Sequence, residues 1–383
     1  MMKQRVKLAI ATLCAIFAVS LTSTAAVTVS GLDDLAANLK KSNVELKMKA
    51  GVYNMTSGST ITIEGSNSSY DFADVKFEAD GTPTIKIVGS GNAVKNLSAE
   101  GVAVVMEGAT NTLEGVTIVT TTANGAEGAS AVVVSGEGNQ VKGCKITLRN
   151  TSHAITIAGA KNPTISGCEI EGAMYTSDGY TLSKVGDGIR TCDKEFSGNK
   201  ISGKVMVVGC TVKYVRRGID LFLGDGSRYV ENCTMVGCQE GYSVNNGGMI
   251  VNCKADSAFG PALWVEGETT TNVTADITLM PYSGEKFEGN KSGHVMFIQG
   301  LGHKITIKQN SALALEAGQT IAIGGDCNTI AYKDKVENLS AANMTITNES
   351  GYTVKIGGNT SYNTIITGSD VEGNTYDNTI EEL

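Results

Sequence analysis

One short phrase that ends in cysteine recurs through the middle of this chain. Each copy reads apolar residue, any residue, Gly or Asn, then Cys, and the five cysteines are Cys144, Cys168, Cys210, Cys233 and Cys253. They are separated by 24, 42, 23 and 20 residues, and we interpret the long step as one turn carrying insertions or as a double step. A phrase that returns after roughly 20–25 residues indicates a solenoid in which each repeat is one coil.

The segments between these copies predict short parallel strands. They alternate apolar and polar residues and end in Gly, Asn or Ser, which is typical of strands followed by turns. Identical residues stacked coil upon coil require strands that run parallel. Earlier versions of the phrase carry Leu97 and Val116 at the cysteine position, and a related Asn-x-Ile phrase continues to the C-terminus. We therefore predict one all-β domain, a single-stranded parallel β-helix, over residues 27–383.

The first 26 residues have the pattern of a secretory signal peptide. A positively charged start is followed by an apolar run from Leu8 to Leu21, and small residues follow up to Ala25-Ala26, near which we expect cleavage. The apolar run is too short for a comfortable membrane span. We therefore predict a secreted protein, periplasmic or extracellular, with no membrane span.

The ladder cysteines are expected to be free thiols in spite of that location. Equivalent residues on neighbouring coils lie about 4.8 Å apart. Their Cβ atoms are then farther apart than the roughly 3.5–4.5 Å that a disulfide needs. We expect them to be buried as small apolar side chains. The pairing of Cys192, Cys238 and Cys327, which lie off the ladder, stays open.

The N-terminal end carries a predicted cap for the solenoid. Ser30 fits the N-cap of a short helix with Leu32, Leu35 and Leu39 on one face, and a strand and turn follow over residues 44–53. Together with the cysteine ladder, this opening resembles the right-handed parallel β-helix proteins of the pectin-lyase-like superfamily. Ala50 stands where similar exported proteins carry Pro. The resemblance covers about residues 30–383 and implies a right-handed coil and a carbohydrate-active protein.

The resemblance does not extend to the catalytic motifs of that superfamily. We find neither the paired-Asp and Arg-Ile-Lys signatures of polygalacturonase-like hydrolases nor the Asp-His and Arg-x-Pro motifs of pectate lyases. The Lys and Arg pair typical of the alginate and chondroitin lyases of this fold is also missing. Candidate residues must therefore come from the register of the coils alone.

Alignment of the coils on the cysteines predicts a charged face. Alternation turns Ile155, Ile189, Ile219 and Tyr242 inward. Two outward columns follow, namely His153, Asp187, Arg217, Glu240 and Thr156, Arg190, Asp220, Ser243. Insertions over residues 172–184 and 193–204 flank these columns, and long loops on a regular scaffold are typical of site walls.

We assign roles to this face by chemistry. The candidate catalytic residues are Asp187, Arg190, Arg217, Asp220 and Glu240, and the candidate substrate-binding residues are Arg216, Arg228, Tyr229, Tyr175, Tyr180 and Trp264. Arginine can bind a uronate carboxylate through two parallel hydrogen bonds, and aromatic rings can stack on sugars. The competing interpretation is that these charges are ordinary surface ion pairs, worth a few tenths of a kcal/mol each.

The most favoured function is that of a polysaccharide lyase acting on acidic glycans. The alternatives are a glycoside hydrolase that uses Asp187 with Asp220 or Glu240, and a non-catalytic protein that binds a surface glycan. A net charge of −8 without a basic stripe argues against nucleic acid as a partner. With three histidines and buried thiols no metal-binding set and no cofactor are evident; a bound Ca²⁺ is possible but not indicated, and the oligomeric state stays open.

Overall fold

The computed structural model describes residues 26–121, 129–172, 175–176, 179–180, 186–193, 195–196, 198–265, 267, 270–282, 292–315, 317–324, 341–375 and 377–383. The predicted signal peptide, apart from Ala26, and Cys327 lie outside these residues. None of the helices in the described ranges is long and apolar enough to cross a membrane.

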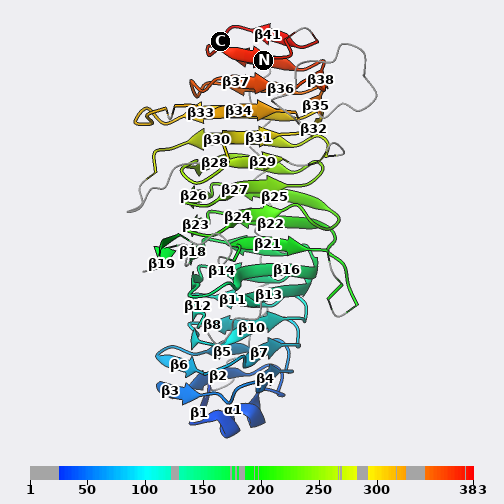
Figure 1. Cartoon of the computed structure of the whole chain (residues 1–383). Helices are drawn as coiled ribbons and strands as arrows, with labels where there is room; N and C mark the ends of the chain where they lie inside the picture. The colour runs from blue at the N-terminus through cyan, green and yellow to red at the C-terminus, as the bar shows by residue number, and fades with distance from the viewer. Residues whose placement is uncertain are drawn as a thin grey trace, which may run out of the picture.

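The chain forms a right-handed parallel β-helix whose coils stack from the N-terminal to the C-terminal end (Figure 1). One wall, called sheet B here, consists of 13 parallel strands. They are β4 (Thr60–Ile63), β7 (Thr84–Ile87), β10 (Ala103–Met106), β13 (Ser130–Glu137), β16 (His153–Lys161), β21 (Ile189–Cys192), β24 (Arg217–Leu221), β27 (Glu240–Val244), β29 (Leu263–Val265), β31 (His294–Ile298), β34 (Thr320–Ile323), β37 (Val354–Ile356) and β40 (Val371–Gly373).

The remaining walls of the coil form sheet A, which has 23 strands. They are β1 (Val27–Val29), β2 (Glu45–Met48), β3 (Gly51–Asn54), β5 (Ser69–Asp71), β6 (Val75–Glu78), β8 (Ala93–Lys95), β9 (Ser98–Glu100), β11 (Thr112–Glu114), β12 (Thr117–Val119), β14 (Gln140–Lys142), β15 (Lys145–Thr147), β17 (Thr164–Ser166), β18 (Glu169–Glu171), β22 (Lys204–Val208), β23 (Thr211–Lys213), β25 (Ser227–Glu231), β26 (Thr234–Val236), β28 (Met249–Ala255), β30 (Thr274–Leu279), β33 (Lys304–Gln309), β36 (Thr345–Asn348), β39 (Thr364–Thr367) and β41 (Thr379–Glu381). Short strands make two further small sheets, β19 (Tyr175–Thr176) with β20 (Gly179–Tyr180), and β32 (Gly300–Leu301), β35 (Ala341–Ala342) and β38 (Thr360–Ser361).

The cysteine phrase marks a corner of the coil. All five ladder cysteines are buried and free, as predicted, and Leu97 and Val116 are buried at the equivalent positions of earlier coils. The residue before each cysteine has a positive φ, for example 57° at Gly143 and 53° at Asn232. Only Gly, and less readily Asn, adopts this left-handed conformation at low energy. The phrase therefore combines a turn that needs Gly or Asn with a small apolar side chain that fits the core. Off the ladder, Cys238 is buried and Cys192 is partly exposed, and both are free.

The N-terminal end is covered by the predicted helix, α1 (Leu32–Asn38), whose Leu35 side chain is buried in the core. The predicted N-cap at Ser30 is wrong. The N-cap is Gly31, which makes no side-chain capping bond, and the Ser30 N–H donates instead to the Asp34 carboxylate at 3.0 Å. Because the helix begins one residue later than predicted, Asp34 and not Asp33 reaches back to the residues before it.

Candidate functional site

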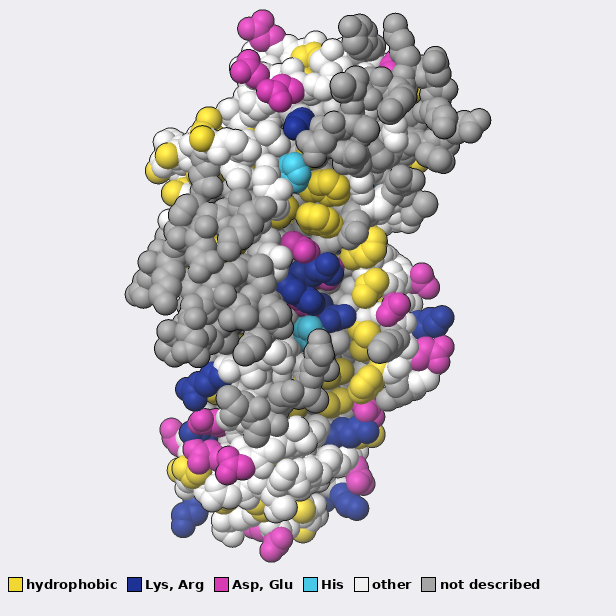
Figure 2. All heavy atoms as spheres, viewed as in Figure 1, with side chains coloured by type: hydrophobic (Ala, Val, Ile, Leu, Met, Phe, Trp, Pro, Cys, Tyr) yellow, Lys and Arg dark blue, Asp and Glu magenta, His cyan; other side chains and the backbone are white. Residues whose placement is uncertain are grey.

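The predicted register of sheet B is confirmed. Ile155 of β16, Ile189 of β21, Ile219 of β24 and Tyr242 of β27 are partners on successive strands and are completely buried. Their neighbours form the second predicted column, Thr156, Arg190, Asp220 and Ser243, on the outer side of the same strands. Basic side chains gather in the middle of this face, with acidic and histidine side chains beside them (Figure 2).

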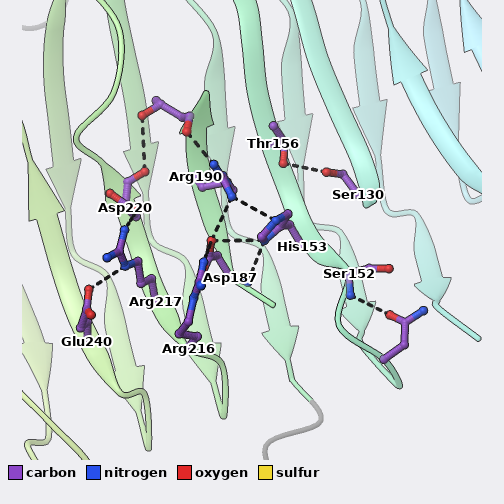
Figure 3. A network of polar contacts seen from close by, with 12 residues as sticks. Ser130, Ser152, His153, Thr156, Asp187, Arg190, Arg216, Arg217, Asp220 and Glu240 are labelled. Carbon is purple, nitrogen blue, oxygen red and sulfur yellow. Dashed lines mark hydrogen bonds and ion pairs between the residues drawn. The ribbon is translucent and has the colours of Figure 1, made fainter. Parts of the chain in front are cut away.

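Asp187 is the centre of the cluster, although its side chain is only 1% exposed. Arg216 binds it through two parallel hydrogen bonds, from Nε to Oδ1 at 2.8 Å and from Nη2 to Oδ2 at 2.9 Å. Arg190 Nη1 lies 3.3 Å from the same Oδ2 (Figure 3). Such a bidentate pair is among the strongest hydrogen-bonding arrangements available to side chains. Asp187 therefore fixes the positions of two arginines.

His153 joins this group at the start of β16. Its Nδ1 lies 3.2 Å from Asp187 Oδ2, and its Nε2 lies 3.0 Å from Arg190 Nη1. The Asp187 backbone N–H also donates to Nδ1, at 3.0 Å, so Asp187 and Arg190 together hold both nitrogens of the ring. His153 was predicted in the outward column, but its ring is buried between Asp187 and Arg190.

Arg217 connects the two other carboxylates. Its Nη1 donates to Asp220 Oδ2 at 3.1 Å, and its Nε lies 2.7 Å from Glu240 Oε2, as an ion pair without an aligned hydrogen bond. Asp220 is nearly buried, whereas Glu240 and Arg217 reach the surface. Since β24 and β27 are neighbouring strands, the two carboxylates lie on adjacent coils with Arg217 between them.

The carboxyl groups differ in their proton affinity. Burial raises the pKa of Glu240 and the charge of Asp220 adds to this, while Arg217 opposes it. Burial would also raise the pKa of Asp187, but the hydrogen bonds from His153 and Arg216 outweigh it and hold that pKa well below its usual range. The surroundings thus favour the charged form of Asp187 and disfavour the charged form of Glu240.

Arg216 and Arg217 also present hydrogen-bond donors to solvent. Their side chains are 41% and 38% exposed. Each guanidinium donates some of its N–H groups to a buried carboxylate, Arg216 to Asp187 and Arg217 to Asp220. Among the described residues none accepts a hydrogen bond from Nη1 of Arg216 or Nη2 of Arg217. The two groups can therefore bind an external anion while they keep their internal partners.

Two predicted substrate-binding residues lie away from this face. Arg228 is 1% exposed, and it donates from Nε to the Leu221 carbonyl and from Nη2 to the Leu223 carbonyl. The predicted role of Arg228 in substrate binding is therefore wrong. The alternation of side chains along β25 turns Arg228 into the coil, where it cannot reach an external carboxylate. Tyr229 is on the outer side of β25, but this strand belongs to sheet A, where Lys204 Nζ lies 4.3 Å from the centre of its ring.

The insertions flank β21. The described chain resumes at Gly186 after the first insertion, and the Gly186 carbonyl accepts a hydrogen bond from the Arg216 N–H. Gly186 therefore lies beside the backbone of Arg216. Tyr175 and Tyr180 are partners in the antiparallel pair β19–β20. Their side chains lie outside the described residues, so their predicted role in binding stays a prediction. The second insertion follows β21 and contains an antiparallel bridge between Phe196 and Asn199.

Trp264 lies two strands beyond Asp220 on the same face of sheet B. It stacks on Phe297, with ring centroids 4.6 Å apart and an interplanar angle of 25°. Phe297 is missing from the sequence prediction. Its place in the outward column could be found only once β29 and β31 are known to be neighbours, because their sequence separation does not follow the ladder step.

Other features of the surface offer less chemistry. A cavity of about 390 Å³ lies on sheet A, where its lining includes Lys145, Glu169 and Lys213. Lys145 and Glu169 form an exposed ion pair at 3.1 Å. No set of His, Cys, Asp and Glu side chains that could hold a metal ion occurs within the described ranges.

The family described as "Right handed beta helix region" has a model that matches residues 84–278, about half of the chain. The chain belongs to this family. No curated protein is significantly similar to it.

Several solved structures are similar to this chain at low identity. An alginate lyase, AlyF-OU02 with G6, is 11% identical, with a TM-score of 0.42 over 94% of this chain and 82% of that one. A PL6 family polysaccharide lyase from Pseudopedobacter saltans is 10% identical, with a TM-score of 0.44 over 93% and 92%. The Siphovirus 9NA tailspike receptor binding domain is 10% identical, with a TM-score of 0.46 over 94% and 76%.

Proposed function

We propose that this β-helix protein is an exported polysaccharide lyase that acts on uronate-containing glycans at the sheet B cluster. The observation that carries the proposal is the convergence of Arg216 and Arg217, each with outward donors, beside a carboxyl group of raised pKa, Glu240. A carboxylate of a sugar is the ligand that such donors bind best. Ordinary surface ion pairs do not require a buried anion such as Asp187 to hold them in place.

The reaction follows from these positions. Arg216 and Arg217 bind the uronate carboxylate and stabilise the negative charge that develops when C5 loses its proton. Glu240 takes this proton as general base, which its raised pKa favours. The electron pair of the C5–H bond forms the C4=C5 double bond. The C4–O4 bond breaks, and the departing oxygen takes up a proton.

A hydrolase is the second candidate, because Asp220 and Glu240 lie on adjacent strands with Arg217 between them. Asp220 is in register with Ser243 and Glu240 is in register with Arg217, so the two carboxylates meet only at the Arg217 guanidinium. A hydrolase needs two carboxylates that face the scissile bond. Asp187 does not qualify as the second carboxylate, since it is sealed by Arg216 and only 1% exposed.

The deciding experiment incubates the protein with a panel of acidic and neutral polysaccharides. It follows two signals, the ultraviolet absorbance of unsaturated uronates and the appearance of new reducing ends. A lyase produces both signals on acidic glycans. A hydrolase produces reducing ends alone. A protein that only binds glycans produces neither, and this outcome contradicts the proposal.

Variants test the assigned roles. We expect Arg217→Ala to lower kcat/KM by about 10²–10³-fold through loss of charge stabilisation, and Glu240→Gln to lower kcat by about 10²–10⁴-fold through loss of the base. Arg149→Ala is the matched control, because Arg149 is an exposed arginine paired with Glu100 at 3.5 Å, outside the cluster. Circular dichroism establishes that each variant is folded. Equal losses in the control and cluster variants would contradict the assignment.

A further inference from the structure

An aromatic platform continues the outward face of sheet B beyond the cluster. The register runs from Asp220 to Ser243, and then to Trp264 and Phe297 on the next two coils. Trp264 and Phe297 are partly exposed, whereas the residues on either side of each in its strand, such as Leu263 and Val265, are buried. With about 4.8 Å per strand, Trp264 lies about 10 Å from Asp220 along the axis of the coil.

The rim of this platform is polar and uncharged. The His294 ring lies 6.1 Å from the Phe297 ring, and its Nδ1 is 3.2 Å from Thr320 Oγ1. Burial lowers the pKa of His294 and the charge of Lys355 lowers it further, which keeps the ring neutral at pH 7. A flat apolar surface with hydroxyl and imidazole groups at its edge matches an uncharged pyranose, which has an apolar face and a hydroxylated rim.

Charged groups are rare along this part of the column. Ser243 precedes Trp264, and Ala322 follows Phe297. The next residue in register is Lys355, two coils beyond Phe297, and its own partner on the following strand is Glu372. A uronate carboxylate on the platform would lose water without gaining a guanidinium partner of the kind that Arg216 and Arg217 offer. Apolar side chains accordingly gather on this face next to the basic group, toward the C-terminal coils (Figure 2).

We propose that the Trp264–Phe297 platform is a subsite for an uncharged sugar of the same glycan chain whose uronate lies on Arg216 and Arg217. The glycan then lies along the axis of the coil, and its repeating unit contains both acidic and neutral sugars. The substrate is an acidic heteroglycan, and a polymer of uronates alone fits the face poorly. This inference rests on the proposed function and specifies its substrate class.

Titration calorimetry with two oligosaccharide probes tests the subsite. One probe alternates glucuronate with neutral hexoses, and the other is oligogalacturonate. The measurements use the Glu240→Gln background, so that neither probe is consumed. Trp264→Ala is expected to weaken binding of the mixed probe about ten-fold, because one stacking surface is lost. Its effect on oligogalacturonate is expected to be less than about two-fold, and Trp264→Phe is expected to retain most of the affinity for the mixed probe.

Tyr362→Asn is the matched control. Tyr362 is a 70% exposed aromatic residue elsewhere on the surface, and its φ of 60° is one that Asn accepts. Equal binding of the two probes, with no effect of Trp264→Ala, overturns the subsite and leaves the proposed function intact. Failure of every glycan to bind the cluster, with no cleavage by the native protein, overturns both. Both substitutions are at partly exposed or exposed positions, and thermal melting confirms folding before the titrations.

Discussion

Replacement of Asp187 by Asn is the most informative test of how the cluster is held together. The substitution keeps the volume of the side chain but removes the negative charge that Arg216 and Arg190 share. Loss of one partner of a buried ion pair costs about 3–5 kcal/mol. Arg216 is 41% exposed and can recover part of its hydration, so we expect a loss of about 2–3 kcal/mol.

The assay is urea denaturation followed by circular dichroism, for native protein and variant, between pH 3 and 8. The folded-state pKa of Asp187 is depressed, so its stabilisation is complete above the unfolded pKa of about 3.9 and is lost as the pH falls below it. We expect a constant difference between the two proteins from about pH 5 to 8 and a smaller difference at pH 3.

Asp276→Asn provides the control, because Asp276 forms a comparable but exposed ion pair with Lys308 at 2.8 Å. This variant is expected to lose less than about 1 kcal/mol. If Asp187→Asn were no more destabilising than the control, or if its effect did not diminish on acidification, Asp187 would not organise the arginines and the account of the cluster would be wrong.

Three further predictions concern the interior. Arg228→Met should lower the free energy of unfolding by about 2–4 kcal/mol in urea denaturation, because the Leu221 and Leu223 carbonyls lose their donor; a loss below about 0.5 kcal/mol would contradict this role. His303 accepts the Val273 N–H at Nδ1, and burial lowers its pKa, so its stabilisation is present above about pH 6.5 and is lost on acidification. The stability gap between native protein and His303→Leu should therefore be larger at pH 8 than at pH 5, and a constant gap would refute this. Among the described cysteines, Cys192 should react first with a thiol reagent in the native state, whereas rapid labelling of Cys168 would contradict a buried ladder.

The fold could be predicted because each coil repeats the same physical requirements. Each coil of the ladder needs a left-handed turn, as at Gly143 or Asn232, and a small side chain at the cysteine that follows. Both requirements are visible in the sequence as the repeated phrase. Register then follows, since residues in parallel strands have equivalent neighbours on every coil. The outward position of Arg190 beside Asp220 could therefore be predicted from the sequence alone.

The site could be predicted only in part, because it depends on contacts that do not repeat. Alternation placed Arg217 and Glu240 together, and counted back from Val230 it also turns Arg228 inward. The carbonyl groups of Leu221 and Leu223 that accept from the buried Arg228 come from an irregular turn, which the repeat does not predict. The burial of His153 depends on side-chain packing against Arg190 and Asp187, which no periodic pattern encodes. The pairing of Trp264 with Phe297 could not be predicted, because the coils that contain them are irregular and their lengths do not follow the repeat.

The most direct test of the central claim is a crystal structure of the Glu240→Gln variant with an acidic oligosaccharide bound. The account predicts a uronate carboxylate on Arg216 and Arg217, with the glycan lying along sheet B. An oligosaccharide bound instead in the sheet A cavity beside Lys145 and Glu169, with the cluster empty, would contradict it.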